Sequence, residues 1–96
     1  MVNMIALPGG FCTMEEYFEM LTWGQLGLHK KPIALLNTYN FYDPLLALAD
    51  SMVGAGFLKQ ENRNLMLSAN EIPVLIEMMQ SYNPPTITNW LKNGEQ

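Results

Sequence analysis

The fold of this chain follows from one segment, Pro8-Gly9-Gly10-Phe11-Cys12-Thr13-Met14-Glu15-Glu16. An apolar run at residues 4–7 precedes it, and an amphipathic stretch follows it. A strand, a glycine turn and a helix start in this order present backbone N–H groups to a phosphate. Glycines let the main chain approach an anion closely, and the helix N-terminus adds partial positive charge. The segment therefore predicts a nucleotide site where a strand meets a helix.

Three units of a strand followed by a helix are predicted along the chain. Apolar runs alternate with stretches in which apolar residues recur at helical spacing, and proline and glycine stand between them. This alternation predicts an α/β fold, here part of a Rossmann-like parallel sheet with about three β-α units. Strands are predicted at about residues 2–7, 32–37 and 65–69, helices at about 14–28, 43–53 and 70–82, and a short helical turn at 60–64.

Polar side chains before the predicted helices are typical helix caps. Thr13 with Glu16 three residues later matches a capping box. Asp43 before Pro44 matches an N-cap and a first helical residue, and Asn70 precedes the last helix in the same way. The glycines predicted to end helices are Gly27, Gly54 and Gly56.

Composition narrows the class of protein. The chain has 96 residues, 49% of them apolar, which is enough for one small domain or part of a larger one. Its net charge of −4 argues against a nucleic-acid surface. It has one cysteine, which fits a reducing compartment, and no apolar run of the ~20 residues that a membrane helix needs. We therefore expect a cytoplasmic protein that binds neither nucleic acid nor membrane.

The opening segment also resembles the signature Pro-Gly-Gly-x-Gly-Thr-x-x-Glu of the Lonely Guy (LOG) family of cytokinin riboside 5'-monophosphate phosphoribohydrolases. The matching positions are Pro8, Gly9, Gly10, Thr13 and Glu16. Cys12 stands where the family has its third glycine. The resemblance continues through residues 21–27, 31–33, 35–37 and 56–58 and implies that residues 1–82 are the C-terminal half of a LOG-like domain. The family's N-terminal half, with its catalytic and substrate-binding basic residues, has no counterpart in the sequence.

The resemblance implies an activity and a set of site residues. The activity is hydrolysis of the N-glycosidic bond of a nucleoside 5'-monophosphate, which releases a cytokinin or adenine base and ribose 5-phosphate. It implies no metal and no organic cofactor, and it implies a homodimer, since family members build the active site near a dimer interface. Glu16 is implied as the catalytic residue. The residues implied to bind the phosphate or the rest of the substrate are Gly9, Gly10, Phe11, Cys12, Thr13, Glu15 and Thr22.

Four of these residues also have a purely structural explanation. Gly9 and Gly10 can serve only a tight turn, and Thr13 and Glu16 can serve only a helix cap worth around 1 kcal/mol. The functional interpretation of Glu16 is that its carboxylate stabilises an oxocarbenium-like transition state or activates water. A backbone at Cys12 that requires a positive φ would place on the order of 1–2 kcal/mol of strain on that residue.

Other chemistries find less support in the sequence. Cys12 is surrounded by acidic residues, which oppose a thiolate, and the single histidine, His29, lies 17 positions further on. The lysines stand in polar, turn-like or terminal contexts, which argues against a pyridoxal-phosphate enzyme.

A second hypothesis remains, that the chain is a non-catalytic nucleotide-binding or interaction remnant, because half of the family domain is missing. For the same reason we expect the isolated chain to be inactive. Residues 83–96 are predicted to form a polar, loose tail.

Overall fold

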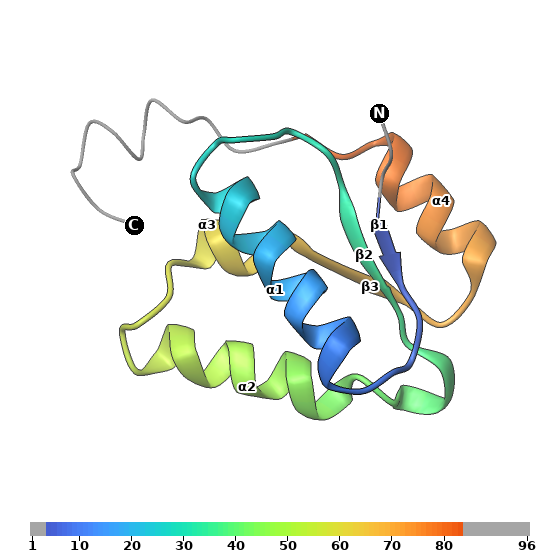
Figure 1. Cartoon of the computed structure of the whole chain (residues 1–96), viewed down its shortest axis with the longest axis horizontal. Helices are drawn as coiled ribbons and strands as arrows, with labels where there is room; N and C mark the ends of the chain where they lie inside the picture. Colours follow the sequence, from blue (N-terminus) through green and yellow to red (C-terminus); the bar gives the residue numbers. More distant parts are fainter. Residues whose placement is uncertain (1–3, 84–96) are drawn as a thin grey trace.

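The computed structural model describes residues 4–83 and shows a parallel sheet with helices on both faces (Figure 1). The strands pair in the order β1-β2-β3, and both pairings are parallel. The predicted α/β class, a partial Rossmann-like sheet built from β-α units, is confirmed. The elements in chain order are β1 (Met4–Ala6), α1 (Phe11–Gln25), β2 (Ile33–Leu36), the 3-10 turn η1 (Thr38–Asn40), α2 (Asp43–Gly54), α3 (Gln60–Arg63), β3 (Met66–Ala69) and α4 (Ile72–Gln80).

The core lies between the sheet and the layer of α1 and α2. Alternate residues of β2, Ile33 and Leu35, point into this layer and are almost fully buried. Tyr17 of α1 and Ala49 of α2 pack against them in the same buried cluster. The opposite face is covered by α4, whose Leu75 is completely buried (Figure 1). The three-strand sheet therefore has two covered faces over β2 and β3.

The region around β1 is covered less well. Among the described residues β1 has one strand neighbour, β2, so its other edge is unpaired. Ile5 of β1 keeps 36% of its surface exposed, because α4 contacts β2 and β3. A hollow of about 280 Å³ lies beside it and is lined by Ile5, Ile76, Met79 and Gln80. Apolar surface is thus left open at the β1 side of the sheet, as three strands with their helices predict.

The start of α1 differs from the prediction. The helix begins at Phe11, Gly10 is its N-cap, and no side chain caps it. The predicted capping box of Thr13 and Glu16 is therefore wrong, since both residues lie inside the helix. The reason is the close approach of Thr13 to Gly9: a Cβ on Gly9 would lie 2.4 Å from the Thr13 hydroxyl oxygen. The glycine pair lets the helix wind one turn further back toward the strand.

Two other predicted caps are also displaced by one residue. Asp43 is the first residue of α2 and Tyr42 is its N-cap, while Glu71 and not Asn70 is the N-cap of α4. The Tyr42 N–H donates to the Asn37 side chain at 2.6 Å, and no side chain caps either helix. The loop conformation that brings Asn37 to the Tyr42 N–H is not visible in local cap signals.

The helix ends follow the sequence more closely. Gly27 with φ 78° and Gly56 with φ 87° adopt left-handed backbone just after α1 and α2, as predicted. None of the helices in residues 4–83 is long and apolar enough to cross a membrane. The predicted tail falls almost wholly in residues 84–96, outside the described part of the chain, as do residues 2 and 3 of the first predicted strand.

Candidate functional site

The glycine loop, residues 7–10, joins the carboxyl end of β1 to the start of α1 (Figure 1). The first intrahelical bond is donated by the Met14 N–H to the Gly10 carbonyl, at 3.1 Å. The N–H groups of Phe11, Cys12 and Thr13 therefore have no acceptor within the helix, and no side chain caps them. Unpaired amides at a helix N-terminus form a binding site for an anion such as a phosphate.

The two glycines of this loop serve different purposes. Gly9 packs under Thr13 so tightly that any side chain on it would collide with the helix. A Cβ built on Gly10 meets no atom within 4 Å, and its φ of −106° is open to other residues. Gly9 is thus needed for the loop conformation, whereas the open side of Gly10 is the side from which an anion can approach.

The carboxylates predicted for the site lie on the exposed side of α1. Glu16 is one turn after Cys12, roughly 6 Å further along the helix axis, and both side chains are exposed. Glu15 lies beside Glu16 on the same exposed side. A phosphate on the first-turn amides would therefore leave the attached sugar within reach of these carboxylates. The structure gathers Glu15 and Glu16 with the glycine loop.

Thr22 is not gathered with them. It lies roughly 13 Å beyond Thr13 along α1, and its hydroxyl donates to the Phe18 carbonyl at 2.8 Å. It lines a hollow of about 150 Å³ between α1 and α2, which is otherwise mostly apolar. Of the predicted binding residues, Thr22 alone is separated from the glycine loop. The residues that the structure brings together are Gly9, Gly10, Phe11, Cys12, Thr13, Glu15 and Glu16.

Cys12 has ordinary helical backbone. Among the non-glycine residues of 4–83, positive φ occurs at Tyr39 and Asn40 alone, so the left-handed strain considered for Cys12 is excluded. Its thiol is exposed. The imidazole of His29 is engaged near the other end of α1, where Nε2 lies 2.9 Å from the Met20 carbonyl and Nδ1 accepts the Lys31 N–H. The histidine therefore does not pair with the cysteine.

Three residues between the end of β2 and the start of α2 were not predicted as part of the site, namely Asn37, Tyr42 and Asp43. Asn37 is buried, and its side chain bonds both the Tyr42 N–H and the Asp43 carboxylate, at 2.6 and 2.8 Å. The phenol of Tyr42 donates a short hydrogen bond to the carbonyl of Leu7, within the glycine loop. A polar residue immediately after a buried strand of a parallel sheet is the signal that could have identified Asn37.

The turn η1, which lies between Asn37 and Tyr42, has an unusual backbone conformation. Tyr39 and Asn40 have φ of 53° and 59°, a left-handed conformation that non-glycine residues adopt rarely. The Tyr39 side chain is 96% exposed. Consecutive strained residues persist only where surrounding contacts hold them, and they concentrate at functional sites.

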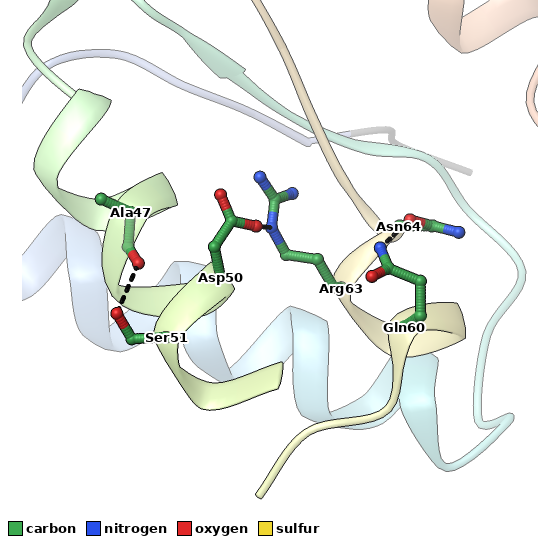
Figure 2. Close-up of polar contacts among 6 residues, drawn as sticks. All are labelled: Ala47, Asp50, Ser51, Gln60, Arg63 and Asn64. Carbon is green, nitrogen blue, oxygen red and sulfur yellow. Dashed lines mark hydrogen bonds and ion pairs between the residues drawn. The ribbon is translucent and has the colours of Figure 1, made fainter. Parts of the chain in front are cut away.

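Positive charge is absent from this edge in the part of the chain that the structure describes. Lys30 and Lys31 precede β2, while Lys59 and Arg63 precede β3, so all four lie at the amino edge of the sheet. Figure 2 shows Arg63 of α3 reaching α2, where its Nε lies 2.7 Å from the Asp50 carboxylate. Within residues 4–83 there is also no group of three His, Cys, Asp or Glu that could hold a metal ion. The glycine loop therefore offers main-chain donors without a cationic side chain.

Comparisons with known proteins identify relatives of this chain. A rice protein (Oryza sativa subsp. japonica) named "Probable cytokinin riboside 5'-monophosphate phosphoribohydrolase LOGL1" is 51% identical over 78 residues, 81% of this chain and 35% of that protein. The rice protein named "Cytokinin riboside 5'-monophosphate phosphoribohydrolase LOG" and the Arabidopsis thaliana protein named "Cytokinin riboside 5'-monophosphate phosphoribohydrolase LOG2" are each 46% identical over 80 residues. These matches cover 83% of this chain and 33% and 38% of those proteins, respectively.

The chain thus spans about a third of the length of the curated relatives it matches. A family model described as "Possible lysine decarboxylase" matches residues 2–79. That match includes β1, the glycine loop and the first turns of α1. On this coverage, and on the identity to proteins named LOG, the chain belongs to the LOG family.

Proposed function

We propose that this chain is the phosphate-binding and catalytic part of a nucleoside 5'-monophosphate phosphoribohydrolase. One observation carries the proposal: the uncapped N-terminus of α1 follows a glycine loop, and the Glu16 carboxylate lies one turn further along. The relatives that the chain matches are named for hydrolysis of cytokinin riboside 5'-monophosphates. We extend that activity to this chain, with a cytokinin or adenine as the base.

The chemistry assigns a separate task to each part of the site. The amides of Phe11, Cys12 and Thr13 hold the 5'-phosphate, and the open side of Gly10 gives it room. The bond between C1′ and the base nitrogen breaks with oxocarbenium character, and Glu16 stabilises the positive charge or activates water. A water oxygen then bonds to C1′, and the base leaves with a proton. The products are free base and ribose 5-phosphate, and no metal or organic cofactor takes part.

The site needs partners beyond residues 4–83. Its phosphate would meet no cationic side chain from the described residues, and Glu16 is exposed to water, which weakens electrostatic stabilisation. We propose that residues 1–82 are the C-terminal half of the domain, and that the N-terminal half of such a domain supplies the basic residues and covers the site. A second copy of the chain packs over the apolar hollow between α1 and α2, where Phe18 and Leu48 are 40% and 52% exposed. This homodimer acts in the cytoplasm without nucleic acid or membrane.

A completed domain tests the activity. It is made by placing the N-terminal part of the rice LOG relative before this chain, and it is incubated with AMP and with N6-isopentenyl-AMP. We expect free base and ribose 5-phosphate in equal amounts, and little or no product from the 96-residue chain alone. A completed domain that binds either nucleotide without releasing base would contradict the hydrolase and favour the non-catalytic remnant.

A further inference from the structure

The carboxyl ends of all three strands are tied together by one hydrogen-bonded network. The main-chain N–H of Asn37 donates to the Ala69 carbonyl at the end of β3, at 2.8 Å. Its side chain accepts the Tyr42 N–H at 2.6 Å and donates to the Asp43 carboxylate at 2.8 Å. Because Asn37 is 5% exposed, water competes little for these bonds. The N-terminus of α2 is thereby fixed to the sheet.

Tyr42 extends this network to the glycine loop. Its side chain is 2% exposed, and its hydroxyl donates to the main-chain carbonyl of Leu7. Leu7 lies after the last paired residue of β1, Ala6, so the strand ladder does not hold its carbonyl. The following residue, Pro8, has no N–H to donate. The phenol of Tyr42 is thus a fixed attachment point for the main chain between β1 and α1.

The strained turn η1 is held by the same residues. The Asn40 N–H donates to the Asn37 carbonyl at 3.2 Å, and Tyr39 lies between these two anchored positions. Two left-handed residues in succession resist relaxation only when both flanks are fixed. The network therefore makes the segment from Asn37 to Tyr42 a stiff support beside the glycine loop.

We propose that Tyr42 is a positioning residue for the phosphate site, acting through the Leu7 carbonyl on the glycine loop. The inference rests on the proposed function, because it assigns Tyr42 a task within that site. Amides arranged before the ligand arrives lose little entropy when the phosphate binds. Burial raises the pKa of the Tyr42 phenol, so the hydroxyl remains a donor throughout the neutral range. Loss of this one hydrogen bond lets the loop move and weakens phosphate binding.

Tyr42→Phe in the completed domain tests the inference, with Tyr17→Phe as the matched control. Both changes remove one buried phenolic oxygen, but the Tyr17 hydroxyl has no hydrogen-bond partner among residues 4–83. Two measurements are made: ¹⁵N order parameters at Gly9 and Gly10 without ligand, and the Kd for ribose 5-phosphate from amide shifts. We expect Tyr42→Phe to lower the order parameters from about 0.85 to about 0.7 and to raise Kd about three- to tenfold. We expect Tyr17→Phe to change neither.

The outcomes separate this inference from the proposed function. Tyr42→Phe with parental order parameters and parental Kd overturns the positioning role. If Tyr42→Phe makes Gly9 and Gly10 mobile but the parent does not bind ribose 5-phosphate, the phosphate site and the role of Tyr42 in it are overturned. The contact between Tyr42 and the loop is then still demonstrated. Equal losses in both variants would show a general effect of core substitution and would also overturn the assignment.

Discussion

The two edges of this sheet differ in how they handle polar groups. At the carboxyl edge, helix amides are uncapped, the turn η1 is strained, and the charged side chains are acidic. At the amino edge, cations gather, and Arg63 is paired with Asp50 (Figure 2). Ligands of open α/β sheets bind outside the carboxyl ends of the strands. The carboxyl edge therefore holds the features that we propose as the site, whereas the amino edge holds the cations of residues 4–83.

The fold by itself supplies the main-chain donors of the proposed site. Main-chain donors at the end of β1 come from topology and two glycines, without any charged residue. The cations of residues 4–83 cannot reach that edge, because they precede the strands and the site follows them. The substitutions that follow ask whether the carboxyl edge behaves as a binding and catalytic edge.

The largest effect is expected for Glu16→Gln in the completed domain. The change nearly preserves the shape of the side chain and removes the negative charge that we propose to stabilise the oxocarbenium ion. We expect kcat to fall by at least ~10²-fold with a modest change in KM, the pattern of a group that acts in the transition state. Initial rates of base release from AMP over a range of concentrations measure both constants.

Glu19→Gln is the control for that substitution. Glu19 lies one turn beyond Glu16 on the exposed side of α1. Its substitution removes the same charge from a position outside the predicted site. We expect near-parental rates for it. A Glu16→Gln protein with near-parental kcat would reduce Glu16 to an exposed helix residue and leave the hydrolase without its central group.

The paired changes Gly10→Ala and Gly9→Ala are expected to act next most strongly. A Cβ on Gly10 meets no protein atom within 4 Å, so we expect the free energy of unfolding of Gly10→Ala to stay unchanged. Its methyl group would crowd the bound phosphate and raise the Kd for ribose 5-phosphate about tenfold.

A Cβ on Gly9 would lie 2.4 Å from the Thr13 hydroxyl oxygen, so the loop in Gly9→Ala must shift, which we expect to lower the free energy of unfolding by about 1–3 kcal/mol. Thermal unfolding and ligand titration of both variants measure these effects. Unchanged affinity in Gly10→Ala would place the phosphate elsewhere.

Much of the fold could be predicted from local sequence. Apolar runs such as residues 33–36 predict strands buried on both faces, and left-handed glycines after α1 and α2 mark the helix ends. The caps could not be predicted in the same way. Tyr42 and not Asp43 is the N-cap of α2, and the contact of its N–H with the Asn37 side chain depends on how the loop between Asn37 and Tyr42 folds.

The site shows the same limit more sharply. The glycine loop and Glu16 are contiguous, so a sequence signature includes them. Tyr42 reaches Leu7 across 35 positions, and neither residue type suggests that contact. Thr22 shows the opposite case, since it lies on the same helix as the predicted site but more than two turns from the glycine loop, and its role in binding stays a prediction. Contacts created by tertiary packing are visible only in the folded chain.

A smaller effect is expected at the core residue beneath the site, through Tyr17→Phe. Burial raises the pKa of the Tyr17 phenol well above its usual value of 10.0, so the folded state favours the neutral form. This contribution to stability is fully present below about pH 10 and is lost as the pH rises further. Phe removes both the ionisable group and a buried hydroxyl without a partner among residues 4–83. We expect about 1 kcal/mol of added stability at neutral pH and a weaker loss above pH 10.

Urea unfolding at pH 7 and pH 10.5 measures this difference. Tyr39→Phe serves as the control, because the Tyr39 side chain is 96% exposed and its hydroxyl is already in water. Parental stability of Tyr17→Phe at both pH values would show that the Tyr17 hydroxyl has found a partner, such as an ordered water.

The smallest effect is expected at Cys12, the one departure from the glycine signature. Its backbone is helical and its side chain is exposed, so Cys12→Gly relieves no left-handed strain and costs up to about 1 kcal/mol of helix stability. Cys12→Ala keeps the Cβ and removes only the sulfur. In the completed domain we expect both variants to stay within about threefold of the parent in kcat/KM, since the amide of residue 12 is unchanged. A tenfold gain in Cys12→Gly over Cys12→Ala would show that the Cβ crowds the phosphate. Loss of activity in both variants, together with inactivation of the parent by iodoacetamide, would show that the Cys12 thiol is a nucleophile. The first turn of α1 would then contribute a reactive side chain as well as main-chain amides.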